Sequence, residues 1–198
     1  MYTAESFSVE KTDAADAKRR LRAQLREKRA GLSARYKNEA SDKIQQYVIN
    51  SQEFLSAETV FIYISTPDEP DTRMIIKQAL RLNKKVYVPK CISKGIMEAV
   101  RFNEGTLLFR GYMGISEPDS SDEKAENIDL SVIPCVSCSS DGKRLGHGGG
   151  FYDIFLSKYE TKRICLCFDK LISDNIPSDE HDILMDKIIT EKTPVTAE

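Results

Sequence analysis

The segment Ile128-Asp-Leu-Ser-Val-Ile-Pro134 and the glycine-rich run Gly146-His-Gly-Gly-Gly150 that follows it decide the fold. The first is an apolar run of the length expected for a buried strand. A helical pattern begins near Tyr152, directly after the glycines. A strand, a glycine-rich turn and a helix in this order form one unit of an α/β sheet.

Five further short apolar runs alternate with helical patterns along the chain. The expected strands are 59–64, 85–89 (ended by Pro89), 98–102, 163–168 and 186–190. Helices are expected over 14–50, with a break at Gly31-Leu-Ser33 and Ser33 as the N-cap, and after Thr72. The pattern predicts a single open, mostly parallel sheet flanked by helices on both faces, with an N-terminal helical segment.

The domain boundaries follow from composition. Residues 1–13 are predicted to be a flexible N-terminal tail and residues 14–198 a single domain, because 198 residues suffice for one α/β core. Residues 103–127 are expected to be irregular and to end in an acidic surface loop.

Composition excludes several classes of protein. Hydrophobic residues make up 40% and charged residues 30%, and the net charge is −2, so neither nucleic acid nor a membrane is indicated as a partner. No apolar run approaches the ~20 residues needed to cross a bilayer, and the first residues do not resemble a secretory signal. The five cysteines are an odd number without such a signal, so reduced thiols and a cytoplasmic location are expected.

The glycine run carries the strongest functional signal. Glycines at the carboxyl end of a strand let backbone N–H groups approach an anion, and Lys143 and Arg144 add positive charge. Asp153 supplies a carboxylate where a magnesium ion bridging to ATP would need one. The spacing matches neither the Walker A motif nor the dinucleotide fingerprint. The alternative is a surface loop without function.

The N-terminal helix carries a basic stripe. At about 100° per residue, Lys18, Arg22, Arg26 and Arg29 fall within an arc of about 80°. Leu21, Leu25 and Leu32 lie on an adjoining arc, so the helix can bury leucines while Lys18 and Arg22 reach a polyanion. A solvated face and an RNA-contacting helix are the alternatives.

The polar loop Thr66-Pro-Asp-Glu-Pro-Asp71 follows the first buried strand and has two interpretations. Its carboxylates could accept hydrogen bonds from a substrate ring, or Asp71 and Thr72 could cap the next helix. Asp182, before the last strand, could be a second metal-binding carboxylate.

Two cysteine pairs, Cys135-x-x-Cys138 and Cys165-x-Cys167, together with His147 and His181, invite a zinc hypothesis. The second pair lies within a buried strand, where thiols serve as ordinary core residues. Core packing is the favoured interpretation.

Taken together, these motifs resemble the 5-formyltetrahydrofolate cyclo-ligase family over about residues 16–190. The family shows an Arg-hydrophobe-Gly-x-Gly-x-Gly-aromatic-Tyr-Asp run like Arg144–Asp153, and an N-terminal Lys-x-x-Leu-Arg element like Lys18–Arg22. Tyr63–Thr72 and Glu180-His-Asp182 match its other two elements.

The resemblance implies an enzyme that converts 5-formyltetrahydrofolate and ATP, with Mg²⁺, to 5,10-methenyltetrahydrofolate, ADP and phosphate through a phosphorylated N5 iminium intermediate. It implies a monomer acting on a folate, polyglutamylated or not. Arg144 and Lys18 would be catalytic and Asp153 and Asp182 would bind the metal. Thr66, Glu69, Asp71 and Tyr152 would contact the folate. The implied ATP-binding residues are Lys18, Arg19, Arg20, Leu21, Arg22, Arg144, Leu145, Gly146, His147, Gly148, Gly149, Gly150, Phe151 and Tyr152.

Some residues depart from the family pattern. Phe151 stands where a tyrosine is common, Asp71 stands for a glutamate, and Cys135 and Cys138 replace small or apolar residues. A folate- or nucleotide-binding regulator without turnover is the non-catalytic alternative, although the presence of Arg144, Asp153 and Asp182 speaks against it.

Overall fold

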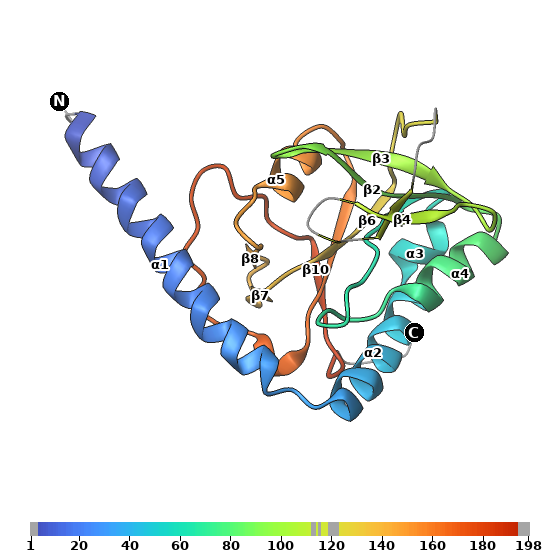
Figure 1. Ribbon diagram of the computed structural model, residues 1–198, viewed down its shortest axis with the longest axis horizontal. Helices are drawn as coiled ribbons and strands as arrows, with labels where there is room; N and C mark the ends of the chain where they lie inside the picture. The colour runs from blue at the N-terminus through green and yellow to red at the C-terminus, as the bar shows by residue number, and fades with distance from the viewer. Residues whose placement is uncertain (1–3, 112–113, 115, 119–122, 194–198) are drawn as a thin grey trace.

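The computed structural model describes residues 4–111, 114, 116–118 and 123–193 of the 198-residue chain. Its centre is a six-stranded sheet in the order β10-β9-β6-β1-β2-β3 (Figure 1). All neighbouring strands are parallel except β2 and β3. The strands are β1 (Thr59–Ile62), β2 (Lys85–Ser93), β3 (Ile96–Phe102), β6 (Leu130–Pro134), β9 (Lys162–Leu166) and β10 (Lys187–Ile189).

Helices cover both faces of this sheet. They are α1 (Ala4–Ala30), α2 (Ala34–Ile49), α3 (Gln52–Ser56), α4 (Arg73–Arg81), α5 (Phe151–Leu156) and a 3-10 turn, η2 (Asp169–Leu171). Helix α4 connects β1 to β2, and α5 lies in the connection from β6 to β9. These two connections run in opposite directions along the sheet. Because such crossovers are right-handed, the two helices lie on opposite faces. Figure 1 shows this arrangement, and the predicted fold class is confirmed.

The core lies between the central strands and the helices. Every residue of β1 is buried, which explains its unbroken apolar run. The Phe61 ring packs against Phe155 of α5, with ring centroids 4.3 Å apart. The strand thus fixes the position of α5 and of the loop that leads into it.

The topology also marks where a ligand would bind. From β1 the chain continues to β2 on one side, and from β6 it continues to β9 on the other, so the direction reverses between these adjacent strands. In open α/β sheets a crevice forms at this point, beyond the carboxyl ends of the strands. Two loops leave from there, 63–72 and 135–150.

The proline in the second strand does not end it, contrary to the prediction. β2 continues past Pro89 to Ser93 and pairs with β3. Its ladder with β1 stops at Tyr87, so Pro89 has a strand neighbour on one side only. A proline N is tolerated where one edge of the strand is free.

Two short antiparallel ribbons were not predicted from the sequence. One pairs β4 (Leu108–Arg110) with β5 (Ser116–Pro118) in the region expected to be irregular. The other pairs β7 (Ser137–Cys138) with β8 (Arg144–Leu145) inside the segment that leads to the glycines. The predicted acidic loop lies partly outside the described residues.

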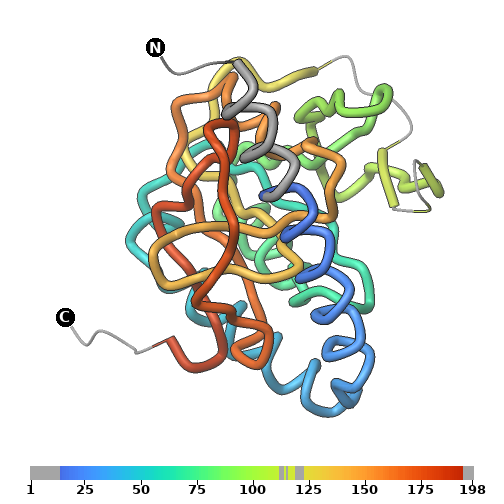
Figure 2. Tube along the Cα trace, turned by 90° about the vertical axis from the view of Figure 1, so that its left-hand side faces the viewer, coloured from blue at the N-terminus to red at the C-terminus, as the bar shows by residue number. Residues whose placement is uncertain are grey.

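The N-terminal helix begins at Ala4 and not near residue 14, where the sequence predicted its start. Residues 4–30 contain no glycine or proline, so no helix-breaking residue delays the start. Ser33 caps α2 as predicted, its side chain accepting from the Tyr36 N–H at 3.2 Å. In Figure 2, the blue part of α1 runs down one side of the domain. Within the described residues no helix is long and apolar enough to cross a bilayer.

Candidate functional site

A cavity of about 810 Å³ lies at the carboxyl end of β6. Its walls come from α1, from the segment 144–154 and from the segment 179–183. It is large enough for a nucleotide-sized ligand. Its charged lining residues are Lys18, Arg22, Arg144, Asp153, Asp179, Glu180 and Asp182.

The glycine run forms one wall, and its glycines are required by close approach and by backbone conformation. A Cβ on Gly146 would lie 2.8 Å from Nη1 of Arg144. Gly148 and Gly150 have φ of +100° and +67°, which side chains disfavour, and Gly150 is the residue from which α5 starts. The backbone of this run therefore faces the cavity next to two arginines, Arg144 and Arg22.

Arg144 is the most constrained of these cations. It is 7% exposed, and its Nη2 donates to both oxygens of Asp153 at 3.0 and 2.9 Å. Nη1 donates to the Pro134 carbonyl at 3.4 Å, while Nε has no partner among the described residues. The β7–β8 ribbon places Arg144 opposite Cys138, so its backbone is fixed as well. The cavity thus has a buried guanidinium with an unused N–H.

Lys18 reaches across the cavity from α1 to the C-terminal segment. Its Nζ lies 2.8 Å from Oδ2 of Asp179 and 2.6 Å from Oδ2 of Asp182. Burial acts to lower the pKa of Lys18, but the two carboxylates outweigh it and raise that pKa. The lysine stays charged and attaches α1 to the segment 179–183.

This ion pair predicts a pH-dependent stability. The hydrogen bond from Lys18 lowers the pKa of Asp179 below its usual value near 3.8. A lowered carboxyl pKa stabilises the fold above its unfolded-state pKa, and that stability is lost as pH falls through the folded value. We expect Asp179→Asn to reduce the free energy of unfolding near neutral pH. The gap in this free energy between the variant and the unsubstituted protein should close in acid.

Urea unfolding from about pH 7 to about pH 3 measures that gap. A gap that stays constant over this range would contradict the assignment of the low pKa to Asp179.

The other predicted ATP-binding residues of the basic helix differ in whether they face the cavity. Nε of Arg22 donates to the Gly146 carbonyl at 2.8 Å, so it lies against the glycine run. Arg19 and Arg20 are exposed and do not line the cavity. At about 100° per residue, Arg20 falls on the side of the helix opposite Lys18 and Arg22, while Arg19 falls beside the basic stripe. The predicted ATP contacts of Arg19 and Arg20 therefore have no geometric support, and Leu21 packs against the core instead.

Arg29 is buried by the same helix face, and the sequence suggested no role for it beyond the basic stripe. It is 8% exposed, and its Nη2 donates to the carbonyls of Cys135 and Val136 at 2.7 and 3.0 Å. Arg26, by contrast, is exposed. The stripe that suggested RNA binding is thus largely turned toward the protein, and Arg29 holds the loop that leads from β6 to Arg144.

We expect Arg29→Met to lower the free energy of unfolding by about 2–4 kcal/mol, because two buried carbonyls lose a charged donor. The exposed Arg20→Met on the same helix is the matched control and should change stability little. Urea unfolding distinguishes them. Equal effects of the two substitutions would mean that Arg29 does not hold the loop.

Two of the predicted metal ligands, Asp153 and Asp182, line the same cavity. The Ile183 N–H donates to Oδ1 of Asp153 at 3.4 Å, so the neighbour of Asp182 touches Asp153 directly. Carboxylate oxygens are the ligands that Mg²⁺ prefers, and it usually retains several waters. By chemical type, Asp153 and Asp182 suit the predicted Mg²⁺ pair. In this structure Asp153 is paired with Arg144 and Asp182 with Lys18.

The loop after β1 brings some of its predicted folate-contacting residues near the glycine run and not others. Thr66 donates from N and Oγ1 to Oε2 of Glu69 at 2.9 and 3.0 Å, and Glu69 lies 3.7 Å from His147 of the glycine run. Asp71 instead accepts from the Arg73 N–H at 3.0 Å and pairs with the Arg73 side chain at the start of α4. Thr66 and Glu69 therefore lie near the glycine run, while Asp71 serves the helix.

Tyr152 and Phe151 lie at the end of the glycine run. Burial raises the pKa of Tyr152, so its hydroxyl remains a hydrogen-bond donor. The Arg144 guanidinium lies 5.5 Å from the centre of the Tyr152 ring. Both aromatic residues line the cavity.

Comparisons with known proteins show the family to which the chain belongs. A sequence profile described as the 5-formyltetrahydrofolate cyclo-ligase family matches residues 14–191. The chain belongs to this family. The cyclo-ligase of Mus musculus is 31% identical over 195 residues, covering 91% of this chain and 96% of that one. The cyclo-ligase of Escherichia coli strain K12 is 28% identical over 174 residues, covering 84% and 96%.

A solved structure agrees as well. The NMR structure of Aquifex aeolicus 5,10-methenyltetrahydrofolate synthetase superposes with a TM-score of 0.77 at 26% identity, covering 88% of this chain and 90% of that one. The family resemblance seen in the sequence motifs is thereby confirmed for nearly the whole chain.

Two residues of the site were missed at the sequence level. Asp179 pairs with Lys18, and Arg29 holds the loop after β6. For Asp179 a signal existed, since it lies three residues before Asp182 in the same acidic segment. For Arg29 the signal was the spacing Lys18, Arg22, Leu25, Arg29, which repeats along one face of a helix.

Proposed function

We propose that this protein cyclises 5-formyltetrahydrofolate to 5,10-methenyltetrahydrofolate, using ATP and Mg²⁺ and releasing ADP and phosphate. Membership of the family supports the folate reaction. The observation that carries the ATP part is the buried Arg144, held beside the glycine run with an unused N–H and with Asp153 next to it.

The phosphates of ATP would lie along the glycine run. Arg22, Arg144 and Lys18 supply the positive charge, and the backbone of 145–150 supplies the close approach. Arg22 forms no ion pair with the carboxylates of the described residues, so its charge is available to an anion. Asp153 and Asp182 would hold Mg²⁺, which neutralises phosphate charge when it is bound.

The reaction needs activation because a formamide oxygen is a poor leaving group. The formyl oxygen attacks the γ-phosphorus, the bond to the β-phosphate oxygen breaks, and ADP leaves. N10 of the resulting N5 iminium phosphate then attacks the formyl carbon and loses its proton. The carbon–oxygen bond breaks, so phosphate leaves with the former formyl oxygen. Positioning and charge stabilisation by Arg144 and Lys18 are what the protein supplies.

The folate would lie beside the loop 66–69. Glu69 lies 3.7 Å from His147 of the glycine run, and its side chain is 9% exposed. Tyr152 follows the same run and lines the cavity. A buried carboxylate can accept hydrogen bonds from the ring N–H groups of a pterin. Asp71 is not included, since its carboxylate is occupied at the start of α4.

We expect Glu69→Gln to raise the KM for 5-formyltetrahydrofolate about 10-fold, because one charge-assisted hydrogen bond is lost. Asp71→Asn should leave this KM unchanged and lower stability by about 1 kcal/mol. Steady-state kinetics and urea unfolding on both variants measure the difference. A larger effect of Asp71→Asn than of Glu69→Gln on this KM would mean that Asp71, and not Glu69, contacts the folate.

The proposed function as a whole is tested by incubating purified protein with 5-formyltetrahydrofolate, ATP and Mg²⁺ and following methenyltetrahydrofolate by its absorbance. Product that requires all three components supports it. Folate binding without turnover would instead indicate a regulator.

A further inference from the structure

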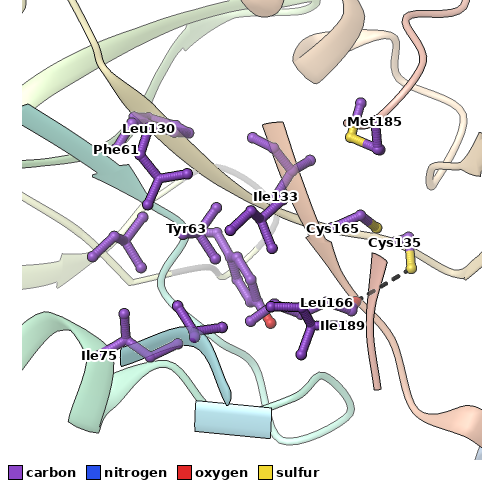
Figure 3. Close-up of a cluster of buried hydrophobic side chains, with 14 of the residues drawn as sticks. Phe61, Tyr63, Ile75, Leu130, Ile133, Cys135, Cys165, Leu166, Met185 and Ile189 are labelled. Carbon is purple, nitrogen blue, oxygen red and sulfur yellow. Dashed lines mark hydrogen bonds between the residues drawn. The ribbon is translucent and has the colours of Figure 1, made fainter. Parts of the chain in front are cut away.

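Four of the five cysteines gather behind the wall of the cavity that carries Arg144. Cys135 and Cys138 follow β6, and Cys165 and Cys167 lie in and directly after β9. All four are at most 2% exposed. The sulfurs of Cys135, Cys138 and Cys165 all lie within 4.8 Å of one another. Figure 3 shows the Cys135 and Cys165 side chains next to each other.

The fold explains why these thiols meet. β6 and β9 are parallel neighbours with Pro134 opposite Leu166, so Cys135 leaves β6 beside the end of β9. Cys165 and Cys167 are two residues apart in extended chain, which puts both on one face of the strand. Cys138 is brought back to this face by the β7–β8 ribbon. Two segments of the chain therefore supply two thiols each.

We propose that this cluster is a structural binding site for a thiophilic divalent metal ion of the zinc class, with Cys135, Cys138 and Cys165 as ligands and Cys167 as the fourth. Zinc in structural sites takes four such ligands, and a C-x₂-C pair is a typical source of two. At a Zn–S distance of about 2.3 Å, tetrahedral sulfurs are about 3.8 Å apart. The spacing of Cys135, Cys138 and Cys165 is within about 1 Å of this value, and Cys167, two residues after Cys165 on the same strand face, would complete the set by rotating its side chain.

Charge balance favours the site. On metal binding each thiol releases its proton to solvent, so a divalent ion with four thiolates has a net charge of −2. A buried negative charge needs positive neighbours. Arg29 donates to the Cys135 and Val136 carbonyls on one side, and Arg144 donates to the Pro134 carbonyl on the other. Both guanidiniums are buried and each has an Nε without a partner among the described residues.

The role of a bound ion would be structural. A bound ion would attach β9 to the ribbon that positions Arg144, without touching a substrate. Since all four coordination positions would be taken by sulfur, the ion would sit in a closed structural site with no position open to substrate or water. The site does not depend on the reaction proposed above.

The test uses the full-length chain, reduced and prepared free of metal, and titrated anaerobically with Co²⁺ and then Zn²⁺. We expect one ion per chain, the absorption bands of tetrahedral cobalt thiolate, their loss when Zn²⁺ displaces Co²⁺, and a higher unfolding temperature. Cys138→Ser and Cys165→Ser should each weaken binding at least 10-fold. Cys91→Ser, at the half-buried cysteine outside the cluster, is the matched control and should bind as the unsubstituted protein does.

Far-ultraviolet circular dichroism verifies that each variant is folded before it is titrated. If a serine variant does not fold, the metal stoichiometry and the cobalt spectrum of the unsubstituted protein test the proposal by themselves. No uptake by the folded, reduced protein would overturn the proposal. So would a cobalt spectrum without thiolate bands, or equal binding by Cys138→Ser and Cys91→Ser.

Discussion

Replacing Arg144 by methionine is expected to lower kcat by about 10³-fold while the Kd for 5-formyltetrahydrofolate changes less than about 3-fold. Arg144 is buried at the glycine run and its position is fixed by Asp153, the Pro134 carbonyl and the β7–β8 ribbon. A donor held in place before the reaction stabilises the charge that develops on the transferred phosphoryl group. The folate is proposed to lie beside the loop 66–69, and none of the hydrogen bonds of the Arg144 side chain among the described residues goes to this loop, so folate binding should persist.

The substitution leaves Asp153 without its partner, so stability has to be measured beside activity. Arg144→Lys keeps the charge without the two-pronged geometry, and we expect it to recover only part of the rate. Steady-state kinetics, folate binding by calorimetry and thermal unfolding on both variants separate the effects. If folate binding falls as much as kcat does, the phosphates have been assigned to the wrong place.

The second large effect is expected at Asp153. Asp153→Asn should raise the Mg²⁺ concentration for half-maximal rate at least 10-fold and lower kcat by about 10²-fold. The amide keeps the shape of the side chain and loses the charge that a hard cation needs. It also weakens the pairing with Arg144.

Asp141→Asn is the matched control, since Asp141 lies in the turn between β7 and β8 and pairs with Lys143 at the surface. We expect its Mg²⁺ response to equal that of the unsubstituted protein. The measurement is the initial rate as a function of Mg²⁺ at saturating ATP. An unchanged response in Asp153→Asn would move the ion away from this carboxylate.

The sheet could be predicted from the sequence because its strands are buried on both faces. Runs such as 59–64 and 128–134 are continuously apolar for that reason, and alternation with helices indicates a parallel sheet. The ribbons could not be predicted, since β7 and β8 have two residues each and their pairing depends on tertiary contacts. The prediction that Pro89 ends the second strand was wrong because β2 has no β1 neighbour at this position. The pairing of the strands decides this, and the residue type alone does not show it.

The site was predictable where chemistry and local spacing coincide. The run from Arg144 to Asp153 is short, and its residues line one cavity. The pairing of Lys18 with Asp179, 161 positions apart, depends on how α1 packs across the domain. The same holds for Arg29 and for the four thiols, which the topology brings together from separate segments.

The central claim is that ATP activates the formyl oxygen in the cavity beside Arg144. The most direct measurement uses 5-formyltetrahydrofolate with ¹⁸O in the formyl group, ATP and Mg²⁺, with mass spectrometry of the phosphate released. We predict one ¹⁸O atom in each phosphate, because the phosphoryl group leaves bonded to the former formyl oxygen. Unlabelled phosphate formed together with methenyltetrahydrofolate would contradict the account.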